Sequence, residues 1–78
     1  MAIHVLFARS GEGPDTVSYT CGDADDPARF RFTLGVDDFG LRGWGGGPVP
    51  NAVRWARAKV VRTVRETGAW PARGAYCA

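Results

Sequence analysis

The side chains able to act as soft metal ligands are few: one histidine, His4, and two cysteines, Cys21 and Cys77. Zinc sites place such ligands at short spacings such as C-x-x-C or H-x-x-x-H. Neither spacing occurs in this chain, so a zinc site would require all three residues to converge through the fold. We therefore expect no metal site, and we interpret His4 as a structural residue of a strand.

Three other segments partly match the patterns of functional sites. The two serines, Ser10 and Ser18, are not in a G-x-S-x-G elbow. The glycine-rich run at residues 43–47 precedes a helix, as a phosphate loop does, but no Lys-Ser/Thr pair follows it. The aspartates of residues 23–26 are spaced like the start of a calcium loop, but its twelfth position is Leu34 rather than glutamate. We therefore predict that the protein is not an enzyme and carries no cofactor.

Positive charge is the strongest chemical signal, and it is unevenly distributed along the chain. Residues 1–40 contain seven acidic and three basic residues, a net charge of −4. Residues 41–78 contain seven basic residues and one acidic residue, a net charge of +6. Nine of the ten basic residues are arginine, and eleven alanines accompany them. This composition is typical of a high-GC genome, so we interpret the chain as a bacterial or phage protein.

Most of the basic residues in the second half fall on one predicted helix. Guanidinium and ammonium groups bind phosphates, and an aromatic ring among them packs against a base or sugar. We therefore hypothesise a nucleic-acid-binding face, with further basic residues supplied by the third strand. Its candidate residues are Arg54, Trp55, Lys59, Arg62, Arg65, Arg29 and Arg31.

Two alternatives to nucleic-acid binding remain open. In one, the arginines form an ordinary solvated helix face and pair with aspartates of the first half. In the other, the charge split lets the acidic end of one chain meet the basic end of another, as in a protein-interaction subunit or a homodimer.

The helix that must position these residues is marked at both ends. Asn51 is a suitable N-cap, or Pro50 occupies the first turn, and Gly68 stands where a C-terminal glycine is expected. Trp55 lies nearly opposite the apolar side, whereas Arg57 lies close to it and is expected to extend toward solvent. The apolar stripe consists of Val53, Ala56, Val60, Val64 and Thr67, with Val61 at its edge.

Three strands are predicted before the helix, at residues 2–9, 16–21 and 29–34. The third shows the cleanest alternation, because Phe30, Phe32 and Leu34 alternate with Arg29, Arg31 and Thr33. The short turns between these strands favour an antiparallel meander. Residues 35–44 read as a fourth strand or as a loop, and the tail at residues 69–78 as a short edge strand near Tyr76.

These elements predict a single α+β domain over residues 1–78, with a meander of three or four strands packed against one C-terminal helix. Hydrophobic residues make up 45% of the chain, which is too high for a disordered protein. The N-terminus lacks the features of a signal peptide, and no apolar run approaches the ~18 residues of a membrane span. We therefore expect a cytoplasmic protein without a membrane partner. In that compartment Cys21 and Cys77 are expected to be reduced, the alternative being a disulfide between them.

Overall fold

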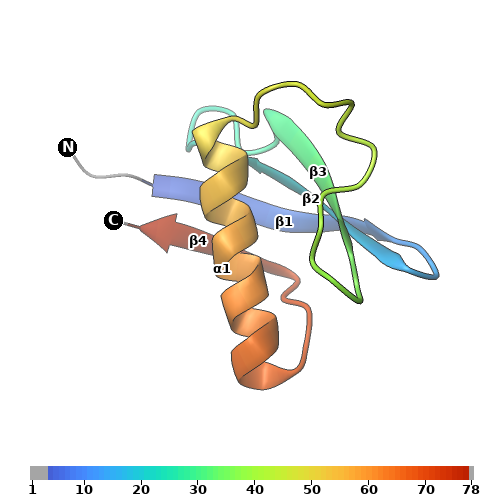
Figure 1. The fold of residues 1–78 in the computed structure, drawn as a ribbon. Coiled ribbons are helices and arrows are strands. Elements are labelled where there is room, and N and C mark those ends of the chain that lie inside the picture. The colour runs from blue at the N-terminus through green and yellow to red at the C-terminus, as the bar shows by residue number, and fades with distance from the viewer. Residues whose placement is uncertain (1–3, 78) are drawn as a thin grey trace.

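The computed structural model describes residues 4–77, which form a four-stranded antiparallel sheet and one helix (Figure 1). The strand order is β3-β2-β1-β4, so the last strand of the chain pairs with the first. This arrangement confirms the predicted α+β fold with one C-terminal helix. The elements are β1 (His4–Glu12), β2 (Thr16–Gly22), β3 (Phe30–Gly35), α1 (Asn51–Thr67) and β4 (Arg73–Cys77).

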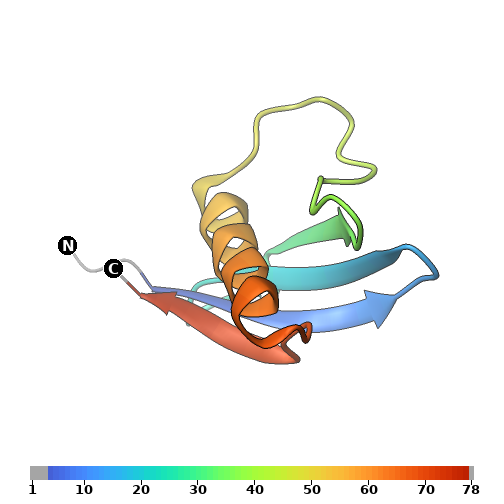
Figure 2. The ribbon, with the colours of Figure 1, turned by 60° about the horizontal axis from the view of Figure 1, so that its bottom comes forward.

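The helix and the long connection at residues 36–50 lie on the same face of the sheet (Figure 2). Among residues 4–77, no helix or strand covers the opposite face. We call that opposite surface the open face. The molecule therefore has two layers over most of its area, and the strands present one side chain in two to each surface.

The core lies between the sheet and α1 and is centred on Tyr19, which is fully buried. The Tyr19 ring stacks on Phe32 with ring centroids 5.7 Å apart and meets the edge of Phe7 at 5.9 Å. Its hydroxyl donates a 2.6 Å hydrogen bond to the Pro71 carbonyl. Aromatic rings therefore fill much of a core with few aliphatic side chains. The remaining buried residues are Val5, Val17, Cys21, Leu34, Val53, Ala56 and Val60.

The first hairpin is longer than the alternation predicted. β1 continues to Glu12, three residues beyond the expected end at residue 9, and the turn closes where Gly13 N–H donates to the Thr16 carbonyl at 2.8 Å. A bulge between Arg9 and Gly11 shifts the register and lets pairing continue. The bulge breaks the period-two pattern, which is why the sequence indicated a turn there. Residues 2 and 3 of the predicted strand lie outside the described residues.

The fourth strand comes from the tail, as the sequence suggested, and pairs with β1 through contacts such as Val5 with Tyr76. Of residues 35–44, Gly35 ends β3 and the rest form no strand; Leu41 makes an isolated bridge to Leu34. The two cysteines are both free: Cys21 is buried and Cys77 is exposed. The alternative of a disulfide is therefore wrong, because β1 separates the two strands and the cysteines face opposite sides of the sheet.

The helix begins differently from the prediction and ends as predicted. Pro50 is the N-cap, with φ −59° and ψ 148°, and its carbonyl accepts from Arg54 N–H at 3.1 Å. Asn51 is consequently the first helical residue, and no side chain caps this end. Gly68 adopts φ 77° and donates its N–H to the Val64 carbonyl at 2.7 Å.

The apolar stripe of the helix is shorter than the sequence indicated. Val53, Ala56 and Val60 are fully buried, and the two later valines are only half-buried. Thr67 was placed on the stripe, but its side chain is exposed and its hydroxyl donates to the Thr63 carbonyl at 2.8 Å. The last turn of α1 extends past the sheet, so no strand lies beneath Thr67 to bury it.

Candidate functional site

The segment that follows β3 turns back toward the sheet and then meets the helix. Gly35 N–H donates to the Gly40 carbonyl at 2.9 Å, and Phe39 N–H donates to the Gly35 carbonyl at 3.0 Å. The chain then returns to the edge of β3, where Arg42 N–H donates to the Thr33 carbonyl at 2.9 Å. These backbone bonds fix a compact loop at residues 36–42 and hold Phe39 against one flank of α1.

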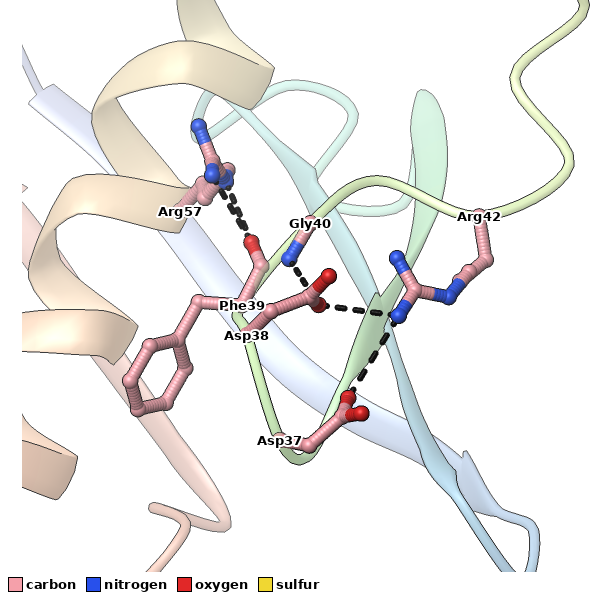
Figure 3. A network of polar contacts seen from close by, with 6 residues as sticks. All are labelled: Asp37, Asp38, Phe39, Gly40, Arg42 and Arg57. Carbon is pink, nitrogen blue, oxygen red and sulfur yellow. Dashed lines mark hydrogen bonds and ion pairs between the residues drawn. The ribbon is translucent and has the colours of Figure 1, made fainter.

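The carboxylates of this loop are engaged within the loop itself (Figure 3). Asp38 accepts from Gly40 N–H at 2.9 Å and from the Arg42 guanidinium at 2.8 Å, and Asp37 lies 3.4 Å from the same guanidinium. The backbone bond from Gly40, and then the bond from Arg42, lower the pKa of Asp38. These acids therefore neutralise Arg42 rather than the arginines of the helix.

Phe39 has φ 59°, in the left-handed region that a bulky side chain seldom adopts. Arg57 holds it there: its Nε and Nη2 atoms both donate to the Phe39 carbonyl, at 2.9 and 2.7 Å (Figure 3). The Phe39 ring packs against Trp70 with centroids 5.6 Å apart, and the Arg65 guanidinium lies 5.6 Å from the ring centroid. The predicted extension of Arg57 into solvent is thus wrong, because a carbonyl acceptor lies within its reach.

A hollow of about 550 Å³ lies between Phe39 and this flank of the helix. We call it the α1–Phe39 groove. It contains four arginines and two acids, and both acids are already paired: Asp38 with Arg42, and Glu66 with Arg62 at 3.0 Å. Its lining residues are Asp38, Phe39, Arg54, Arg57, Ala58, Val61, Arg62, Arg65 and Glu66.

Three of the groove arginines have no acidic partner among residues 4–77: Arg54, Arg57 and Arg65. Arg57 binds a neutral carbonyl and Arg65 lies over an aromatic ring, so neither charge is cancelled. Arg54 and Arg65 are eleven positions apart, which corresponds to ~16 Å along a helix. The groove therefore presents a row of three positive charges that no acid of the described residues compensates, which makes its local potential positive.

The structure divides the predicted binding residues among three places. Arg54, Arg62 and Arg65 line the groove, whereas Trp55 and Lys59 lie on the other flank of α1. Trp55 is half-buried and stacks on Tyr76 of β4, with ring centroids 6.0 Å apart and planes 6° from parallel.

The expectation that Trp55 faces away from the sheet, among the arginines, is therefore wrong. A long side chain on a helix leans toward the preceding turn, and here Trp55 reaches over the edge formed by β4. Lys59 is one turn further along the same flank.

The remaining two candidates lie outside the groove. Arg29 precedes β3 and lies over the Phe30 ring, 5.3 Å from its centroid. Arg31 is exposed on the open face, opposite Thr20 of β2.

The sequence assigned no role to Phe39, and Arg57 was not among the candidate binding residues. The position of Phe39 depends on a φ value that favours glycine or asparagine, so no local pattern predicts it.

No family model matches this sequence, and no curated protein or solved structure is significantly similar to it. Within residues 4–77, no group of three His, Cys, Asp or Glu side chains is placed to hold a metal ion. The single helix of the described region is too short and too polar to cross a membrane. The description of the site therefore depends on its own geometry and charge.

Proposed function

We propose that the protein is a non-enzymatic binding module that holds nucleic acid by its phosphates in the α1–Phe39 groove. The observation that carries the proposal is the row formed by Arg54, Arg57 and Arg65, which have no acidic partner among the described residues. Phosphate contacts from such residues supply most of the sequence-independent affinity for nucleic acid.

The length of the row favours a polyanion over a small anion. One phosphate group contacts side chains that converge on it, whereas Arg54 and Arg65 are ~16 Å apart along the helix. Phosphates repeat along a nucleic-acid strand, so neighbouring phosphates are able to meet successive arginines of the row.

The groove also offers donors and an aromatic surface beside the charges. Arg57 uses two of its five N–H donors on the Phe39 carbonyl, which leaves three for another acceptor. The Phe39 ring is half-buried at the rim, where a sugar or base is able to pack against it. The groove therefore combines backbone contacts with one stacking surface, and it provides no array of side chains for reading a particular base sequence.

The test is fluorescence anisotropy with labelled duplex and single-stranded oligonucleotides at ~50 mM salt and above. Arg54→Ala/Arg65→Ala removes two charges from the groove, and Lys59→Ala/Arg29→Ala removes two charges outside it. The groove variant is expected to bind the oligonucleotides about 10- to 100-fold more weakly. The slope of the logarithm of its binding constant against the logarithm of the salt concentration is expected to become shallower by about two. The control variant is expected to stay within about threefold of the wild type.

Two outcomes contradict the proposal. One is a dissociation constant weaker than about 1 mM for both oligonucleotides at the lowest salt. The other is an equal loss of affinity in the two double variants, which would show that net charge alone governs binding. Circular dichroism on both variants checks that the helix is retained.

A further inference from the structure

The open face of the sheet differs in chemistry from every other surface of the molecule. One row runs across all four strands through Arg73, Ala8, Thr20 and Arg31, which are paired neighbours from β4 to β3. An arginine therefore stands at each edge of the sheet, and two small side chains lie between them. The next pair, Leu6 with Ala75, is apolar.

This face is hollowed rather than flat. A depression of about 710 Å³ lies over Leu6, Ala8 and Ala75 and is bounded by Pro27 and Ala28 of the β2–β3 turn. The turn reaches onto this face, because a Cβ placed at Gly22 would collide with the carbonyl oxygen of Asp26. Gly22 therefore allows the turn to fold down and form one wall of the depression.

The charged side chains that the strands themselves present to the open face have one sign. The strands of residues 4–77 contain a single acid, Glu12, which pairs with the buried Val17 and so belongs to the helix side. Arg31 and Arg73 form no ion pair within the described residues. An occupant that pairs with both arginines and covers the depression would be apolar in the middle and acidic on both sides.

The spacing of the two arginines suits a helix. Arg31 and Arg73 are three strands apart, which corresponds to ~14 Å across a sheet. An α-helix with its side chains is about 10–12 Å wide. We propose that the open face docks an amphipathic helix of a partner protein, with the apolar stripe of that helix over Leu6, Ala8 and Ala75 and acidic residues on its flanks paired with Arg31 and Arg73.

A second copy of the chain does not fit this description. The only helix of the described region, α1, carries one acid and five basic residues, including Arg54 and Lys59, so it would bring positive charge to positive charge. Two open faces packed together would likewise place arginines against arginines. Nucleic acid fits less well, because the open face has an apolar floor, and the aromatic rings of the sheet point to its other side.

The experiment is a display library of about 18-residue helical peptides with a fixed Leu/Ala stripe and randomised flank positions. It is selected against the wild-type protein and against Arg31→Glu/Arg73→Glu. Acidic flanks are expected to be enriched on the wild type and basic flanks on the variant, with at least about a tenfold reversal in relative affinity for resynthesised peptides. The groove variant Arg54→Ala/Arg65→Ala is expected to keep the wild-type preference.

The proposal is overturned if neither protein enriches any peptide, or if both proteins enrich the same flank charges. It is also overturned if the groove variant, rather than the open-face variant, changes the selection. Concentration-dependent dimerisation that Arg31→Glu/Arg73→Glu abolishes would assign the face to self-association instead. The test involves no nucleic acid, so its result is independent of the function proposed for the groove.

Discussion

The two faces of the sheet are built from alternate residues of the same strands, yet they differ in nearly every property. In β1, Val5 and Phe7 are buried beneath the helix, whereas Leu6 between them and Ala8 after them face the open side. The helix face supplies every buried side chain of the sheet, whereas the open face supplies the half-buried Leu6 together with small, polar and basic side chains. The difference teaches that stability is concentrated on one face, which leaves the composition of the other face free to serve binding.

The test with the largest expected effect makes the same substitution, leucine to alanine, once on each face of the sheet. Leu34 is fully buried on the helix face, and Leu34→Ala is expected to cost about 2–5 kcal/mol of unfolding free energy because it leaves a cavity. Leu6 is only half-buried, and Leu6→Ala is expected to cost under ~1 kcal/mol. Urea unfolding followed by circular dichroism measures both. Equal losses would mean that the open face also belongs to a packed core.

The second test is alkaline pH, which acts on two buried groups of the helix face. Burial raises the pKa of Tyr19 from 10.0 to about 12 and that of Cys21 from 9.0 to about 11. Both groups ionise at a lower pH in the unfolded chain than in the folded protein. Their contribution to the unfolding free energy is therefore complete below about pH 9 and is lost as the pH rises through 11 and 12. The expected slope is at most about 1.4 kcal/mol per pH unit for each group.

Urea unfolding at a series of pH values between 8 and 12 measures this loss. Tyr19→Phe/Cys21→Ala removes both groups and should flatten the pH dependence of the unfolding free energy. Cys77→Ala, at an exposed position, should leave that pH dependence unchanged. A wild-type stability that stays constant up to pH 12 would contradict the burial of both groups.

The third test removes single hydroxyl groups. Tyr19→Phe leaves the Pro71 carbonyl without its 2.6 Å donor and is expected to cost about 1 kcal/mol. On the open face, Ser18 and Thr33 hydroxyls lie 2.8 Å apart, and Ser18→Ala is expected to cost less because water replaces the lost partner. Thermal unfolding ranks the two variants. The reverse order would show that the open-face hydroxyl pair is the more protected one.

The smallest expected effect comes from the arginines of the open face. Arg31→Ala and Arg73→Ala should each change the unfolding free energy by less than ~0.5 kcal/mol, because both side chains are exposed and neither forms an ion pair among the described residues. Urea unfolding is again the measurement. A loss above ~1 kcal/mol would assign them a structural role and weaken the case for a docking surface.

Much of the fold could be predicted because it follows from periodicity. The alternation around Phe32 identified the buried face of β3, and the spacing of Val53, Ala56 and Val60 identified the buried side of α1. The bulge near Gly11 defeated the same reasoning because it shifts the period. The site was less predictable, because the direction of Trp55 was inferred only from the angular position of this residue around the helix axis.

The groove itself could not be predicted from local sequence. It exists because Phe39 adopts an unusual φ value and because Arg57, eighteen positions away, binds its carbonyl. Contacts of that kind connect a loop to a helix across the fold, and no composition or spacing encodes them. Arg54 and Arg65 were identified as candidates from charge alone, but their grouping around Phe39 was not.

The most direct test of the central claim is an NMR titration of the ¹⁵N-labelled protein with an oligonucleotide at low salt. The account predicts chemical-shift changes concentrated at Phe39, Arg54, Arg57 and Arg65, with the amides of Leu6 and Ala8 on the open face unchanged. Shifts concentrated on the open face, or no shifts at all, would contradict the assignment of nucleic-acid binding to the α1–Phe39 groove.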